Sequence, residues 1–301
     1  MRSPELPNAA GGNPLVRRWL LGGFAFFGVS AAVIALASPQ DTFTATITVP
    51  VAEPISAPMP ATVDMADMTW VEVRSAIARG YTTAIVPSGG IEQNGPHMVL
   101  GKHDYIVRAN ANRIAKKLGH TLVTPVVSYV PEGNYEPRSG NMLFPGTLGI
   151  PEPVFAQVLE GIARSLKSAG FKTIFFIGDH GGNQAAQAKV AAKLNREWAG
   201  HMTVLNGSDY YVDEAQIKYL RGKGETEASI GSHAGLIDTS ELLAVHPQGV
   251  ELARLSSLPP QSESPGHSGD PTRASVEYGK ALLDIRVNAA IRQIRAALPG
   301  Q

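Results

Sequence analysis

Residues 84–104, AIVPSGGIEQNGPHMVLGKHD, give the clearest indication of the fold. An apolar run over residues 83–86 predicts a buried strand, and the Gly/Pro-rich residues after it predict a loop. Residues 173–183, TIFFIGDHGGN, repeat this plan with a second strand and a second polar loop. Loops at the carboxyl ends of parallel strands meet at the edge where open α/β sheets bind ligands. The polar side chains expected at this edge are Glu92, His97, His103 and His180.

Helix-like and strand-like segments alternate on both sides of these two strands. Apolar periodicity and end signals predict helices over residues 70–78, 106–118, 154–166 and 184–198, and strands over residues 121–127 and 202–205. The alternation indicates an α/β fold, with three layers (α/β/α) around a mainly parallel sheet, formed by one domain over residues 68–301. The third of these helices should bury Val154, Val158, Ile162 and Leu166, and a last helix should start at Asp270 and Pro271.

The composition excludes several classes of partner and chemistry. Of 301 residues, 44% are hydrophobic, so the chain can bury a sizeable core. Lys plus Arg equals Asp plus Glu at 26 each, so no overall charge favours nucleic acid, and a small-molecule substrate is expected. The chain has no cysteine, which excludes disulfides, a thiolate nucleophile and cysteine-held metal. A metal would therefore need histidine and carboxylate ligands.

The amino terminus predicts export. Residues 19–37, WLLGGFAFFGVSAAVIALA, are uncharged and follow Arg17 and Arg18, so residues 1–18 form a positively charged leader. The segment suits the core of a cleaved signal peptide or a short transmembrane anchor, with a buried core helix as the less favoured reading. Both favoured readings place the remainder in the periplasm, free or membrane-anchored, or outside the cell. Residues 38–67, rich in Pro, Thr and Ala, read as an extended linker.

Five motifs, in order, are similar to those of the creatininase (creatinine amidohydrolase) family, whose metal-dependent α/β enzymes hydrolyse C–N bonds in cyclic amides and related substrates. The family pattern EQHGPHLPLGTD corresponds here to EQNGPHMVLGKH at residues 92–103. The other matches are FPGT at 144–147, HGGN at 180–183, HAG and DTS within 233–240, and GDP at 269–271. The resemblance implies a creatininase-like fold, hydrolase chemistry and a homo-oligomer, commonly a hexamer in this family.

The chain departs from the family at its second metal. In the family pattern, a His, a bridging Asp and a later Glu hold that ion. Here Asn94 stands for the His, His103 for the Asp, and Gly182 for one position of the Glu. A neutral imidazole cannot bridge two ions as a carboxylate does, so the sequence predicts a single-metal site.

The remaining ligand set suits one catalytic divalent cation. Glu92, His103 and His180 are a two-His, one-carboxylate set, which fits zinc with an open position for water and also fits iron or manganese. Asp104 is the alternative to His103, because a shift of the loop by one residue would present it instead. We favour His103, since the helix that follows aligns without the shift.

Other residues have expected roles that the sequence leaves open. His233 is placed by the resemblance on the substrate side or in proton transfer. His97 could act directly, orient the loop or bind substrate, and Asp238 could be a base, a fourth ligand or a helix N-cap. Asp179 could support a ligand from behind. Candidate substrate-binding residues are Asn94, Glu136, Arg138, Gly181 and Gly182, although the two glycines could simply permit a tight turn.

Two rival functions follow from the same residues. The missing second-metal ligands could leave an exported binding protein without catalysis. A two-His, one-carboxylate site can also hold iron for oxygen chemistry. Neither explains the five matched motifs better than amide hydrolysis.

Overall fold

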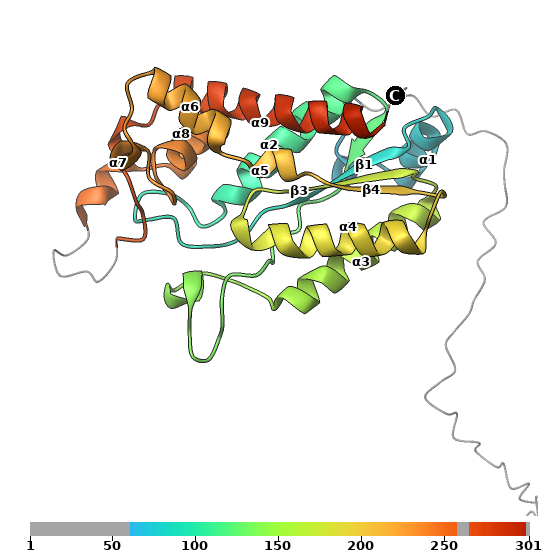
Figure 1. Cartoon of the computed structure of the whole chain (residues 1–301), viewed down its shortest axis with the longest axis horizontal. Coiled ribbons are helices and arrows are strands. Elements are labelled where there is room, and N and C mark those ends of the chain that lie inside the picture. Colours follow the sequence, from blue (N-terminus) through green and yellow to red (C-terminus); the bar gives the residue numbers. More distant parts are fainter. Residues whose placement is uncertain (1–60, 258–264, 299–301) are drawn as a thin grey trace, which may run out of the picture. The chain divides into compact units, whose positions relative to one another are not determined.

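The computed structural model describes residues 61–257 and 265–298 of the chain. Its centre is a parallel sheet with strand order β2-β1-β3-β4 (Figure 1). The two central strands pair along their whole length, from Thr83 opposite Thr173 to Ser88 opposite Gly178. Because both strands end at the same level, the loops that follow them meet. The strands are β1 (Thr83–Ser88), β2 (Thr121–Val123), β3 (Thr173–Gly178) and β4 (Thr203–Asn206).

Helices cover both faces of the sheet, as the sequence predicted. One face packs against α3 (Glu152–Ala169) and α4 (Gln184–Glu197), and the other against α2 (Lys102–Leu118) and α9 (Val276–Ala297) (Figure 1). The three-layer α/β/α arrangement is therefore confirmed. The further helices are α1 (Trp70–Ala78), α5 (Ser208–Tyr211), α6 (Glu214–Gly222), α7 (Glu227–Ile230) and α8 (Leu236–Val245).

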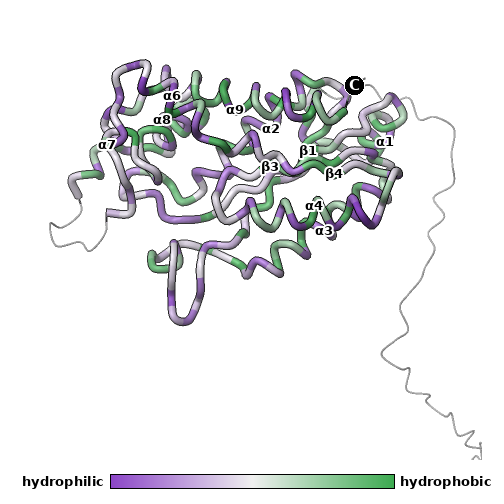
Figure 2. Tube along the Cα trace, viewed as in Figure 1, coloured by the Kyte–Doolittle hydropathy of each residue, from purple (hydrophilic) through white to green (hydrophobic). Residues whose placement is uncertain are grey.

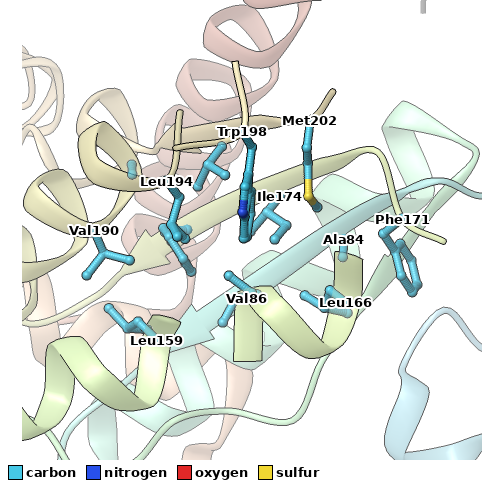
Figure 3. Close-up of a cluster of buried hydrophobic side chains, with 14 of the residues drawn as sticks. Ala84, Val86, Leu159, Leu166, Phe171, Ile174, Val190, Leu194, Trp198 and Met202 are labelled. Atoms are coloured by element: carbon cyan, nitrogen blue, oxygen red, sulfur yellow. The ribbon is translucent and has the colours of Figure 1, made fainter. Parts of the chain in front are cut away.

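Successive side chains of β1 and β3 point to opposite faces of the sheet, and each face has its own hydrophobic core. Val86 and Ile174 point toward α3 and α4, where they meet Leu159 and Leu194 (Figure 3). Ile85, the residue before Val86, packs instead with α2 and α9. Figure 2 shows hydrophobic residues along the middle of this stack and hydrophilic residues on the outer helix surfaces. Each fully buried Leu, Ile or Val contributes about 1.5–3 kcal/mol, so the cores hold the two central strands firmly.

The start of α2 corrects the first sequence prediction. The helix begins at Lys102, four residues before the predicted residue 106, and Gly101 is its N-cap. Its first turn is polar, so apolar periodicity could not reveal it. His103 and Asp104 consequently lie on a helix, and not in the preceding loop.

The buried face of α3, the end of β2 and the start of the last helix also differ from the prediction. On α3, Leu166 is buried and Ile162 partly buried, as predicted, but Val154 and Val158 are exposed and Phe155 and Leu159 are buried in their place, so the first half of the predicted face was wrong by one residue. Strand β2 ends at Val123, before Pro125, which lacks an N–H for a ladder. The last helix begins at Val276 with Ser275 as N-cap, whereas Asp270 caps only the 3-10 turn Pro271–Arg273.

The amino-terminal predictions fall almost entirely outside the described residues. Residues 1–18 and 19–37 are not described, and of residues 38–67 only the last seven are. Within that short part, the Val123 N–H donates to the carbonyl of Val63, and Asp64 forms a parallel bridge with Val123. Among the described residues, no helix combines the length and the apolar composition that a membrane span requires.

Candidate metal centre

Three donor side chains converge beyond the carboxyl ends of β1 and β3. Glu92 comes from the loop after β1, His180 from the loop after β3, and His103 from the first turn of α2. One donor atom from each lies within 4.8 Å of the others, close enough to hold one metal ion. Glu92 Oε1 is 2.7 Å from His103 Nε2, and Glu92 Oε2 is 3.3 Å from His180 Nδ1. The two imidazoles therefore face the same carboxylate from different elements.

A second carboxylate supports His103 from behind. His103 Nδ1 lies 2.8 Å from Asp179 Oδ2. The other oxygen of Asp179 accepts hydrogen bonds from Arg286 at 2.6 Å and from the Tyr210 hydroxyl at 3.0 Å. A carboxylate on the far nitrogen fixes the ring and directs the other nitrogen toward a metal. The donor set and this support both fit a divalent cation.

The charges around Glu92 keep its carboxylate ionised. Burial alone would raise its pKa, but His103 and Lys102 hold that pKa well below its usual range. The pKa of His103 is raised to about 9, because Glu92 and Asp179 outweigh the opposing effects of burial and Lys102. In the metal-free protein a proton on His103 thus takes the place of the cation.

Lys102 is a buried cation that the sequence did not single out. Its Nζ lies 2.8 Å from Asp238 Oδ2 and 3.5 Å from Glu92 Oε1, and its side chain is fully buried. Its pKa is raised, because these two carboxylates outweigh burial, and the pKa of Asp238 is lowered below its usual range in spite of burial. An aspartate held ionised in this way is a weak general base.

Asp104, the alternative to His103, faces away from the three donors. Its Oδ1 accepts a hydrogen bond from the N–H of Gly90 at 3.1 Å. A Cβ on Gly89 would lie 1.8 Å from the same oxygen, so helix α2 packs tightly on the loop here. The structure thus brings His103, and not Asp104, to Glu92.

Helix α8 corrects one role that was open for Asp238. The N-cap of α8 is Gly235, and Asp238 lies inside the first turn, so the N-cap interpretation is wrong. Asp238 Oδ2 accepts a hydrogen bond from the N–H of Ala234 at 2.8 Å. This bond, together with the Lys102 ion pair, ties the start of α8 to the start of α2.

His233 lies beside the three donors and remains partly exposed. Its Nδ1 is 3.8 Å from Glu92 Oε1. Its Nε2 is 3.0 Å from the Gln93 carbonyl oxygen and 2.8 Å from the Gln93 side-chain nitrogen. Burial and Lys102 lower the pKa of His233, so the ring is neutral near pH 7. The Gln93 carbonyl can accept only from a protonated Nε2, whereas the Gln93 amide nitrogen, whose oxygen accepts from Gly95, can donate only to an unprotonated Nε2. The two contacts therefore favour opposite tautomers of His233.

Two other candidate residues, His97 and Asn94, are buried and shape the loop after β1. His97 is buried, and its Nε2 lies 3.0 Å from the Thr239 hydroxyl, which favours the loop-orienting role that the sequence left open. Asn94 is fully buried and donates to the carbonyls of Glu92, Val99 and Leu100. It holds the loop closed, and a substrate could not reach it in this conformation.

The other predicted substrate-binding residues lie in two places, two of them on an exposed loop and two directly after His180. Glu136 and Arg138 are exposed on the loop of residues 129–151, which projects below α3 in Figure 1. Gly181 and Gly182 follow His180 directly. A Cβ on Gly182 would lie 2.2 Å from the carbonyl oxygen of Pro131, so the close packing of that loop requires glycine here.

Sequence reasoning missed Glu132 and Asn141, which complete the surroundings of the centre. Glu132 Oε2 lies 3.2 Å from His180 Nε2, and the Asn141 amide contacts both Glu132 and Glu92. Both residues come from a Gly/Pro-rich loop without periodicity, so the sequence contains no signal of where their side chains point.

Comparison with known proteins identifies this arrangement. The sequence model of the family described as "Creatininase: Creatinine amidohydrolase" matches residues 66–294. The chain belongs to the creatininase family. Creatinine amidohydrolase of Pseudomonas putida is 27% identical over 261 residues, covering 80% of this chain and 99% of that protein. The family and the three-donor centre make the chain a metal-dependent amidohydrolase.

Other creatininase relatives differ in what they act on and what they bind. The mycofactocin precursor peptide peptidase of Mycolicibacterium smegmatis is 28% identical over 239 residues, covering 71% of this chain and 85% of that protein. A solved mutant of creatininase superimposes with a TM-score of 0.66 at 26% identity, covering 79% of this chain and 99% of its own. Creatininase has also been solved with manganese and, as a mutant, in a zinc–zinc form. A divalent metal is therefore shown for creatininase itself.

Proposed function

We propose that this chain is an exported amidohydrolase that holds one divalent cation on Glu92, His103 and His180 and hydrolyses an amide-like C–N bond. The observation that carries the proposal is the convergence of the three donor atoms within 4.8 Å. Zinc is the cation that this donor set suits best, and manganese or iron would also fit.

The chain's own residues would do the following work. A cation bound here supplies a water that ionises near neutral pH and a polarised substrate carbonyl. His233, neutral and beside Glu92, accepts the proton of the attacking water and returns it to the leaving nitrogen. Asp179 keeps His103 oriented throughout. Asp238, held ionised by Lys102, is a poor acceptor for the proton of the attacking water.

A single cation is the stoichiometry that the side chains favour. Asn94 directs its amide nitrogen at three backbone carbonyls, and Gly182 supplies no side chain. His103 directs Nε2 toward Glu92 and the proposed cation, and its Nδ1 is taken by Asp179, so no ring nitrogen remains for a second ion. Asp238, the remaining candidate for a fourth ligand, is paired with Lys102.

Turnover of defined amides tests this function. The chain would be loaded with zinc or manganese and assayed against creatinine, other cyclic amides, formamides and short peptides, because relatives are named for both creatinine and a peptide. We expect hydrolysis of at least one compound, lost on chelation and restored by metal. Glu92→Gln should abolish it. A chain that binds metal without hydrolysing any of the panel would favour the non-catalytic alternative, and oxygen-dependent turnover with iron would favour the other rival.

The export proposal rests on residues 17–37 and needs its own test. A reporter that is active only outside the cytoplasm, fused after Gln301, should be active in the full chain and inactive when residues 1–37 are deleted. Cell fractionation would then show whether the product is soluble or membrane-bound, and its mass would show whether the segment has been cleaved. Activity of the fusion without residues 1–37 would contradict export by this segment.

Self-association is proposed from exposed apolar side chains and from the resemblance. Val154 and Val158 of α3 are 43% and 39% exposed, on a helix whose other face is buried in the core. Light scattering of the purified chain should give a mass several times that of one chain. A monomer at micromolar concentration would contradict it.

A further inference from the structure

We infer that Glu132 is a positioning residue that holds His180 in the tautomer presenting Nδ1 to the metal. Glu132 lies on the loop of residues 129–151, outside the matched motifs, and it is one of the most buried carboxylates in the described part of the chain at 4% exposure. The inference rests on the proposed metal centre and concerns how that centre is kept in shape.

The contacts of His180 assign its two ring nitrogens to different tasks. Nδ1 faces Glu92 Oε2 at 3.3 Å, on the side of the three donors. Nε2 faces Glu132 Oε2 at 3.2 Å and the carbonyl oxygen of Pro131 at 3.2 Å. The Pro131 carbonyl can only accept, and Glu132 Oε2 already acts as the acceptor for the Asn141 amide. Nε2 must therefore carry the proton, which leaves the lone pair on Nδ1 for the cation.

This arrangement matches the one around His103. There, Nε2 faces Glu92 and Nδ1 is backed by Asp179. Each histidine is thus held between Glu92 and a second buried carboxylate. Support of this kind sets the ring orientation and the tautomer and commonly changes metal affinity 10- to 100-fold.

Asn141 links the two carboxylates on the His180 side. Its Nδ2 lies 3.0 Å from Glu132 Oε2 and also donates to Glu92 Oε2. The amide therefore fixes the separation between Glu132 and the donor Glu92. Its Oδ1 lies 3.5 Å from Gln93 Nε2, which orients the amide with nitrogen toward the carboxylates.

The surrounding glycines make room for Glu132. A Cβ on Gly90 would lie 2.9 Å from Glu132 Oε1, and a Cβ on Gly149 would lie 2.8 Å from Glu132 Cβ. A side chain on Gly182 would meet the Pro131 carbonyl at 2.2 Å, so the space beside His180 is taken by the segment that carries Glu132. None of the described residues hydrogen-bonds Glu132 Oε1. Such a carboxylate oxygen, buried without a partner, is costly for stability alone, which points to a role at the centre.

Metal affinity of matched variants tests the inference. Zinc dissociation constants would be measured by competition with a chromophoric chelator for the wild type, Glu132→Ala, Glu132→Gln and the control Glu136→Ala, which removes an exposed carboxylate from the same loop. We expect Glu132→Ala to weaken zinc binding 10- to 100-fold. Glu132→Gln keeps an acceptor oxygen but loses the charge, so it should weaken zinc binding measurably but less than tenfold, and Glu136→Ala should leave it unchanged.

The tautomer supplies a readout that loop packing would not change. Nitrogen-15 shifts of the His180 ring in the zinc-loaded chain should show the proton on Nε2 in the wild type and a mixture in Glu132→Ala. Folded Glu132→Ala with wild-type zinc affinity and an unchanged His180 tautomer would overturn the inference while leaving the proposed function intact. A wild-type chain that binds no metal would overturn both. If Glu132→Ala does not fold, the affinity and tautomer of Glu132→Gln decide, and wild-type values there would refute the role.

Discussion

At the scale of single residues, the centre depends on opposite charges buried together. Glu92, fully buried, is surrounded by Lys102, His103 and His180, and each of these has a second carboxylate partner. A buried charge is tolerable only when it is paired and hydrogen-bonded. Removing one partner should therefore affect stability and metal affinity in directions that can be stated in advance.

Metal binding should become tighter as pH rises. In the metal-free chain the pKa of His103 is raised from 6.5 to about 9, so below pH 9 the cation must displace its proton. The apparent zinc affinity should rise about tenfold per pH unit between pH 6.5 and 9 and then level off. Chelator competition across this range measures it. The same raised pKa stabilises the metal-free fold below pH 6.5, and this contribution is lost as pH rises through 9. An affinity that does not change with pH would refute the protonated His103.

Removing the Lys102 ammonium should destabilise the fold. Lys102→Met leaves Asp238 without its cation at 2.8 Å, which should cost about 3 kcal/mol in the free energy of urea unfolding. Lys116→Met, an exposed lysine on the same helix, should change it by less than about 0.5 kcal/mol. Adding Asp238→Asn to Lys102→Met should restore part of the loss. Equal effects of the two single lysine variants would show that the Lys102 pair contributes nothing.

At the scale of elements, the centre is placed by the packing of helix α2 on the loop after β1. The first turn of α2 carries both Lys102 and His103, and Gly89 lies directly beneath Asp104 of the same turn. The absence of a side chain at Gly89 therefore allows α2 to pack this closely on the end of β1.

Filling that contact should disturb the metal centre. A Cβ at residue 89 would lie 1.8 Å from Asp104 Oδ1 and 2.9 Å from Asp104 Cα, so Gly89→Ala must move the backbone of α2. We expect a loss of about 1–3 kcal/mol of stability and weaker zinc binding. Gly161→Ala is the matched control: it lies inside helix α3, its Cβ meets nothing within 4 Å, and it should stabilise by up to about 1 kcal/mol. Normal zinc affinity in Gly89→Ala would show that this contact does not position His103.

The sequence could predict elements where apolar residues repeat and could not where they do not. Strands β1 and β3 are continuous buried runs, and the Thr69–Glu72 capping box of α1 is present in full. The first turn of α2 is polar, so its start was placed too late. At the site, Glu92 and His180 were predictable because they lie in the loops that follow two buried strands. Glu132 was not, because its position depends on the path of an irregular loop.

At the scale of the whole molecule, distant segments meet at the centre. Arg286 of α9, near the carboxyl terminus, donates to Asp179, which supports His103. The donors themselves are spread from residue 92 to residue 180. A cation held by side chains from separate elements binds the folded chain and not the unfolded one, so it should stabilise the entire domain.

Zinc should therefore raise the unfolding temperature of the wild type. At 100 times its dissociation constant, a ligand specific for the folded state contributes about 2.7 kcal/mol. His103→Ala should show no such shift at the same zinc concentration, whereas Asp104→Ala should keep it, because Asp104 faces Gly90 and not the donors. Calorimetric scans with and without zinc measure both. Loss of the shift in Asp104→Ala with retention in His103→Ala would reverse the assignment of the ligand.

Counting the bound metal decides whether this creatininase-family hydrolase holds one ion per chain. Elemental analysis of the zinc-reconstituted and dialysed chain, against protein concentration from amino-acid analysis, should give one zinc per chain. Glu92→Gln, assayed alongside, should give close to none. Two ions per wild-type chain would contradict the single-metal centre, and no metal would contradict the metal centre itself.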